Sequence, residues 1–180
     1  MEICRRGLAD DSRAASLKTP KDQRKPIVRT SFPSPILDRT SLFGVSNTTA
    51  LRTCFRVGEA LNTGCQAVRT NWNVVLEIYA RVTSSWREPK PSRKQHFIIN
   101  DLYHDRPPSI NGTFELWNEN ALWEEDSRPF LDANSDGMMC RMLAKMKRDG
   151  TKWRLEILSI WQADWDDIDH AAGIYTKTSL

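Results

Sequence analysis

The sequence predicts an all-β domain with short helices, behind a basic N-terminal tail. Residues 139–161 place Asp149-Gly150 between two apolar, alternating segments. This is the strongest short-range signal of a β-hairpin, because a type I′ turn needs positive φ at both central residues. Residues 74–82 carry an apolar residue at every second position, which is the period of a strand with one buried face.

Length and composition limit the possibilities. The chain has 180 residues, of which 39% are hydrophobic and 27% charged, so there is room for one domain and a tail. The formal net charge of +3 is mildly basic and does not by itself indicate nucleic acid. The carboxylates gather in residues 115–136 and 164–169, so the remainder of the chain is more basic than the average.

Cysteine usage and hydropathy predict a reducing compartment. The cysteines at positions 4, 54, 65 and 140 form no C-x-x-C pair, so free thiols are expected and neither a disulfide framework nor a metal site. The N-terminus lacks the apolar core of a signal peptide. No run approaches the roughly 18 apolar residues that span a bilayer. The chain is therefore expected in the cytosol or nucleus, with no membrane contact and no cofactor.

Residues 1–46 are predicted to be a disordered tail, and residues 47–180 the domain. Lysine, arginine, serine and proline dominate the tail, and low hydrophobicity with positive charge is typical of disorder. The basic run 18–29 fits a nuclear import signal or a phosphate-binding arm, and equally a solvated tail. Apolar pairs such as Ile27-Val28 would suit docking to a protein partner.

The elements of the domain follow from local patterns. Residues 51–71 fit a short helix or a short strand, and we favour a strand or turn that leads into the domain. The acidic residues 164–169 would begin a closing helix, because carboxylates in a first turn suit the helix dipole, and Gly173 would end it. The other predicted elements are strands at 74–82, 96–103 and 113–117, and a helical turn at 121–125.

The hairpin is expected to have one apolar and one basic face. With Asp149-Gly150 as the turn, Met146 opposes Trp153 and Met142 opposes Ile157, which makes a core face. The other face carries Lys145, Lys147, Lys152 and Arg154. Like charges across a strand pair are destabilising, so keeping them together suggests an anionic partner. The alternative is a solvated Lys/Arg face that protects a sheet edge.

This order of elements resembles an OB-fold, in particular the OB domains of replication protein A and telomere-end-binding proteins. The resemblance covers residues 72–173 and depends on element order, which an SH3-like barrel would also match. It implies a five-stranded Greek-key β-barrel with a closing C-terminal helix. It also implies that a ligand lies on the second and third strands, between the first and fourth inter-strand loops.

Both of these loops are basic, which points to single-stranded DNA or RNA as the ligand. Phosphates need cations, and bases need flat side chains on which to stack. The tryptophans at 123, 153, 161 and 165 are instead expected in the core. The predicted nucleic-acid-binding residues are Tyr79, Arg81, Trp86, Arg87, Lys90, Arg93, Lys94, Tyr103, Lys145, Lys147, Arg148, Lys152 and Arg154.

Two other functions remain possible at this point. A protein-interaction OB domain would scaffold a nuclear complex through the tail or the acidic helix at 164–169. An enzyme would need an acid/base pair, for which His104-Asp105 is the one candidate, and no phosphate loop or nucleophile elbow accompanies it. The sequence therefore favours a non-catalytic nuclear module of replication, repair or telomere complexes, with DNA preferred over RNA.

Overall fold

The computed structural model describes residues 25, 27, 49–115, 121–133 and 136–176. The predicted tail at 1–46 lies outside these residues except for Lys25 and Ile27. Within the described part of the chain, no helix has the length and hydropathy needed to cross a bilayer.

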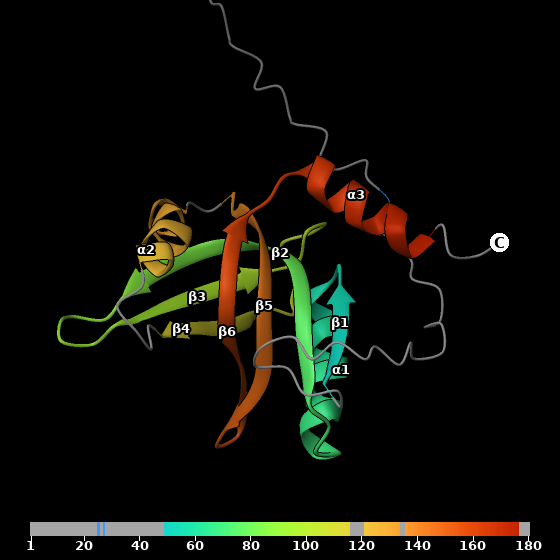
Figure 1. Cartoon of the computed structure of the whole chain (residues 1–180), viewed down its shortest axis with the longest axis horizontal. Coiled ribbons are helices and arrows are strands. Elements are labelled where there is room, and N and C mark those ends of the chain that lie inside the picture. Colours follow the sequence, from blue (N-terminus) through green and yellow to red (C-terminus); the bar gives the residue numbers. More distant parts are fainter. Residues whose placement is uncertain (1–24, 26, 28–48, 116–120, 134–135, 177–180) are drawn as a thin grey trace, which may run out of the picture.

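Five strands close into a barrel (Figure 1). Their order around the barrel is β2–β3–β4–β6–β5, and β5 pairs back onto β2. All neighbours are antiparallel except β4 and β6, which are parallel. Helix α2 and the 3₁₀ helix η2 connect β4 to β5. The strands are β2 (Val74–Arg87), β3 (Lys94–Asn100), β4 (Ile110–Glu115), β5 (Met138–Asp149) and β6 (Lys152–Gln162), and the connecting helices are α2 (Ala121–Ser127) and η2 (Arg128–Asp132).

This topology is that of the OB-fold, and it confirms the fold predicted from the sequence. A five-stranded Greek-key barrel with a helix between the third and fourth barrel strands defines the architecture. The core is filled by inward side chains of every strand, including Ile78, Phe97, Phe114, Met142 and Ile157. Each strand therefore alternates core and outer positions, and the outer positions determine what the barrel can bind.

Two elements precede the barrel, so residues 51–71 contain both the strand that was favoured and the helix that was its alternative. Strand β1 (Ala50–Cys54) pairs in parallel with β2, and helix α1 (Val57–Arg69) follows it. The buried positions of α1 are Val57, Ala60, Gly64 and Ala67, which is the spacing of one helix face. Three of these four residues are small, which lets α1 approach β5 and β2 closely at Gly64.

The close packing of α1 on β5 predicts opposite effects for the same substitution at two helical glycines. A Cβ at Gly64 would lie 2.8 Å from Met146 Cβ and 3.1 Å from Leu76 Cδ1, whereas a Cβ at Gly173 would meet nothing within 4 Å. Gly64→Ala is expected to lower the free energy of unfolding by about 1–2 kcal/mol through overpacking. Gly173→Ala is expected to raise it by up to about 1 kcal/mol through helix propensity. Urea denaturation measures both, and equal signs would contradict the packing of α1.

The β5–β6 hairpin is present, but its register differs from the prediction by two residues. Asp149 pairs with Lys152, so Gly150, with φ of +59°, and Thr151 form the turn. Met146 consequently faces Leu155 rather than Trp153, and the predicted core face is kept because a shift of two preserves the alternation. A bulge between Leu143 and Ala144 then shifts the pairing once more, which places Ile160 in the core.

Helix α3 (Trp165–Thr176) closes the barrel beside β2 (Figure 1). Asp164 caps it reciprocally with Asp167: the amide of Asp167 donates to Asp164 Oδ1 at 2.9 Å, and the amide of Asp164 donates to Asp167 Oδ2 at 3.1 Å. Ile168 anchors α3 in a second apolar cluster with Phe55 and Tyr79. The predicted stop at Gly173 is wrong, because the helix continues to Thr176.

Candidate nucleic-acid interface

Trp86 and His96 form an aromatic platform on the outer face of the barrel. They are paired residues of β2 and β3, and their rings stack with centroids 5.1 Å apart and planes 10° apart. Trp86 is 47% exposed. Its outward direction follows from a bulge between Val82 and Ser84, which shifts the alternation of β2 by one residue. An exposed flat ring on a barrel face is a surface on which a base can stack.

The platform is held by the turn between β2 and β3. Glu88 Oε1 lies 2.6 Å from His96 Nε2, and the Ser92 hydroxyl donates to Glu88 Oε2 at 2.5 Å. Hydrogen bonds from Ser92 and then His96 lower the pKa of the Glu88 carboxyl. The ionised carboxylate therefore fixes the orientation of the imidazole beneath Trp86.

Outward side chains continue from the platform across β4 to β6. His96 pairs with Thr113, and Thr113 pairs with Glu156. A second row of outward residues paired across the strands begins with Ile98 on β3 and Asn111 on β4. Hydroxyl and amide groups therefore lie between the aromatic platform and the β5–β6 hairpin.

That second row ends in two cations. Asn111 pairs with Arg154, and Arg154 pairs across the hairpin with Lys147. Each cation has an acidic neighbour: Lys147 Nζ lies 2.6 Å from Glu156 Oε1, and Arg154 Nη1 lies 3.7 Å from Asp149 Oδ2. Both ion pairs are at least partly exposed, where such pairs contribute little and exchange readily. The cations therefore remain available to a phosphate.

The other predicted cations of the two loops have mixed surroundings. Lys90 and Arg93 are exposed in the β2–β3 turn, and Lys152 is exposed at the start of β6. Lys94 Nζ lies 3.6 Å from Glu115 Oε2 on the neighbouring strand. Lys145 donates to Asn73 Oδ1 at 3.1 Å.

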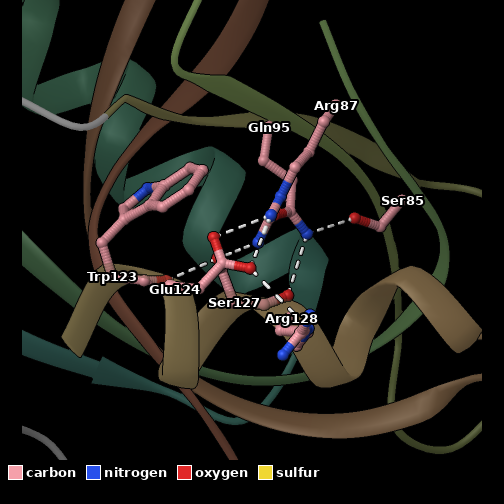
Figure 2. A network of polar contacts seen from close by, with 7 residues as sticks. All are labelled: Ser85, Arg87, Gln95, Trp123, Glu124, Ser127 and Arg128. Atoms are coloured by element: carbon pink, nitrogen blue, oxygen red, sulfur yellow. Dashed lines mark hydrogen bonds and ion pairs between the residues drawn. The ribbon is translucent and has the colours of Figure 1, made fainter. Parts of the chain in front are cut away.

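Arg87 lies on the opposite side of β2 from Trp86 and holds helix α2 (Figure 2). Its Nη1 donates to both oxygens of Glu124, at 2.9 and 2.8 Å, and its Nε donates to Gln95 Oε1 at 2.9 Å. The guanidinium carbon also lies 4.5 Å from the ring centroid of Trp123. Gln95 is fully buried and bridges Ser85 to the carbonyl of Ser127. Arg87 is therefore occupied inside the fold and is absent from the outer face.

Arg81 is also occupied internally. Its residue is only 4% exposed, and its Nε donates to the carbonyl of Asp101 at 2.9 Å. Nη1 donates to the carbonyl of Asp136 at 3.1 Å, and Nη2 contacts the carboxylate of Asp105 at 2.5 Å. These bonds tie two loops to β2, and they direct the donor groups of Arg81 away from the outer face of β3 and β4.

The two predicted tyrosine platforms are covered. Tyr79 is 4% exposed and stacks on Phe55 with ring centroids 5.3 Å apart. The hydroxyl of Tyr103 accepts the amide of Ile27 at 3.3 Å, and its ring lies against Trp165. Burial raises the pKa of both phenols. Neither ring adjoins the Trp86 platform, so neither belongs to the interface that the geometry supports.

The structure thus brings part of the predicted set onto one face and separates the rest. Trp86, Lys94, Lys147 and Arg154 share the outer surface of the barrel, on β2, β3, β5 and β6, whereas Tyr79, Arg81, Arg87 and Tyr103 are packed elsewhere. Sequence reasoning missed the outward residues of β3 and β4. The alternation of Phe97 and Ile99 in β3 was sufficient to identify His96 as outward.

The acid/base candidate His104 is part of the packing around α1. His104 Nε2 lies 3.1 Å from Arg56 Nη2, and its Nδ1 lies 3.1 Å from the carbonyl of Arg106. Asp105 is the partner of Arg81. Among residues 49–115, 121–133 and 136–176, no three His, Cys, Asp or Glu side chains gather as a potential metal site.

Comparisons with known proteins give structural matches only. No family model matches the chain, and no curated protein matches it significantly. The crystal structure of yeast Stn1 and Ten1 matches with a TM-score of 0.42 and 10% identity over 72% of this chain and 91% of that chain. The S. pombe Stn1-Ten1 complex matches with a TM-score of 0.41 and 11% identity, over 58% of this chain and 71% of that chain. A replication protein A heterotrimer bound to ssDNA matches with a TM-score of 0.38 and 10% identity, also over 58% and 71%. The OB-fold itself is assigned from the strand order and pairing of this barrel.

Proposed function

We propose that the domain is a non-catalytic module that binds single-stranded nucleic acid, DNA in preference to RNA, within a nuclear genome-maintenance complex. One observation carries the proposal: the exposed, stacked Trp86–His96 pair lies on the outer face of the first and second barrel strands, β2 and β3. OB-folds bind oligonucleotides on the adjoining face of the second and third strands, which His96 shares, between the loops that flank it.

The polar groups around the platform support the same ligand. A base stacked on Trp86 would lie near the polar side chains of Thr113 and Asn111 on β4. The phosphates would contact Lys94 on one side and Lys147 and Arg154 on the other. Acidic groups are interleaved with these cations, so the face is not strongly positive. Stacking is therefore expected to contribute more to affinity than phosphate contacts do.

Fluorescence anisotropy with labelled oligothymidylate and oligouridylate tests the proposal. Trp86→Ala is expected to weaken binding of oligothymidylate by about 1–3 kcal/mol, because one stacking partner is lost. The double variant Lys147→Ala/Arg154→Ala is expected to reduce the slope of log K against log salt by about 1.4, since single strands release about 0.7 counterion per phosphate contact.

Arg128→Ala is the matched control, because Arg128 is a 75% exposed arginine on the α2 side of the molecule. It should change neither the affinity nor the salt slope. No salt-sensitive binding of either oligonucleotide at low salt would refute the proposal. Stronger binding of oligouridylate would retain the interface and assign it to RNA, because the 2′-hydroxyl distinguishes the two.

Helix α3 and the N-terminal tail would then serve a protein partner. The described face of α3 is acidic, with Asp166 and Asp169 exposed, and Ile174 is 58% exposed near its end. A helix that presents carboxylates and an exposed aliphatic side chain suits protein docking better than phosphate binding. If the anisotropy experiment shows no nucleic-acid binding, this docking role becomes the main function.

A further inference from the structure

We propose that a single-stranded nucleic acid bound on the outer face of β3 and β4 continues past the β5–β6 turn onto a second aromatic and basic site. This site is made by Arg69, Trp72, Arg148 and Trp153. This inference rests on the proposed function and extends it. It concerns residues at the α1 end of the barrel, of which Arg148 is among the nucleic-acid contacts predicted from the sequence.

Trp72 is held outward by the turn that ends α1. Asn71 takes a left-handed conformation with φ of 56°, and the amide of Trp72 donates to the carbonyl of Ala67 at 2.8 Å. Trp72 is 74% exposed, the largest exposed fraction among the large hydrophobic residues of the described chain. A tryptophan fixed by its backbone and open to solvent offers a ready stacking surface.

Two arginines lie against the neighbouring indole. The guanidinium carbon of Arg69, from α1, lies 6.0 Å from the ring centroid of Trp153, and that of Arg148, from β5, lies 5.6 Å from it. Contact with an aromatic ring favours the cation without neutralising it. In the residues that the structure describes, no carboxylate forms an ion pair with Arg69 or Arg148. Both charges can consequently bind a phosphate without first giving up an ion pair, whereas Lys147 and Arg154 must exchange theirs.

The hairpin places this site next to the proposed groove. Arg148 pairs with Trp153 and Lys147 pairs with Arg154, so the two pairs occupy opposite faces of the same ribbon. The turn at Gly150 and helix α1 lie at the same end of the molecule (Figure 1). A single-stranded nucleic acid that extends beyond Lys147 and Arg154 is therefore expected to pass the turn and to contact Arg148 and Arg69 before it reaches Trp72.

The alternation of cations and indoles favours a nucleic acid over an acidic peptide. Phosphates and bases alternate along a single strand, and such a chain needs charge and flat rings in the same order. An acidic peptide is the competing occupant, because a pocket of about 80 Å³ lies beside Trp72 and would take one aliphatic side chain. This pocket is small for a base, so the base is expected on the exposed ring and not in the pocket.

Oligonucleotide length separates the two sites. Oligothymidylates of about 6 and about 18 nucleotides lie near the low end and beyond the high end of the roughly 4–16 nucleotides that one OB-fold covers. Trp72→Ala is expected to weaken binding of the long oligonucleotide about tenfold and to leave the short one unchanged. Arg69→Ala/Arg148→Ala should reduce the salt slope by about 1.4 for the long oligonucleotide only.

Leu131→Ala is the control, because Leu131 is 37% exposed on η2, which follows α2 on the other side of the barrel from α1 (Figure 1). Thermal unfolding should show all three variants folded. Equal affinity of wild type and Trp72→Ala for the long oligonucleotide would overturn the inference. If Trp72→Ala abolishes binding of a leucine-containing oligoglutamate peptide and leaves binding of the long oligonucleotide unchanged, the inference is overturned in favour of a peptide site.

The experiment can refute the proposed interface on β3 and β4 independently of the site at Trp72. If Trp86→Ala leaves the short oligonucleotide unaffected while Trp72→Ala weakens the long one, the β3–β4 interface is refuted and the site at Trp72 stands alone. If Trp86→Ala weakens both lengths and Trp72→Ala weakens neither, the groove stands and the extension is refuted. No binding of either length to the wild type overturns both proposals.

Discussion

Replacing Arg81 with leucine is expected to lower the free energy of unfolding by about 3–5 kcal/mol, because a buried polar network loses its central donor. The guanidinium satisfies the carbonyls of Asp101 and Asp136 and pairs with Asp105. Its side chain is 5% exposed, so water cannot replace these bonds without opening the loops. Urea denaturation followed by circular dichroism gives the change directly.

The matched control is Arg106→Ala, since Arg106 is an exposed arginine in the same loop region. A surface substitution of this kind is expected to change stability by no more than about 0.5 kcal/mol. An Arg81→Leu variant as stable as the wild type, but weaker in oligonucleotide binding, would show that Arg81 contacts the ligand after all.

Replacing Arg87 with alanine is expected to cost about 2–3 kcal/mol and to loosen α2. Arg87 binds Glu124 bidentately and satisfies Gln95, which is fully buried. The cost is moderate because the side chains of Arg87 and Glu124 are 26% and 43% exposed, so water partly screens the ion pair. Helix α2 has only 7 residues, which is too short to be stable without tertiary contacts. Hydrogen exchange of residues 121–132 should therefore accelerate more than that of the barrel strands.

Arg128→Ala tests whether the effect belongs to the bidentate pair. Arg128 Nε lies 3.7 Å from the same Glu124 carboxylate, and its side chain is 75% exposed. Its loss is expected to change the free energy of unfolding by about 0.5 kcal/mol or less. Equal losses in the two variants would mean that Arg87 does not anchor α2.

The barrel could be predicted from the sequence because its strands carry strong periodic signals. The alternation in β2 and β3 and the Asp149-Gly150 turn were enough to give the order of the elements. Helix α1 was weighed as an alternative for residues 51–71 but not favoured, because Thr53, Phe55 and Val57 fit the alternation of a strand equally well.

The candidate site was predicted less well, because bulges and tertiary cover decide which polar residues face outward. The bulge after Val82 directs Trp86 outward and Arg87 inward, which simple alternation along β2 reverses. Arg81 does lie on the outer side of β2, but the loops carrying Asp101 and Asp136 cover it. Neither effect is visible in the local sequence, since both depend on segments that lie far along the chain.

The pairing of β2 with β5 also governs when the barrel can form during synthesis. Leu76 pairs with Ala144, so these two partners of the closing seam lie 68 positions apart in the sequence. Contacts of such long sequence separation form slowly, and a nascent chain cannot make them until β5 has left the ribosome. Strand β1 pairs with the opposite edge of β2 and is synthesised just before it. The early β1–α1–β2 unit therefore shields one edge of β2 while the other waits for its partner, and unpaired edges are what bring nascent β chains together.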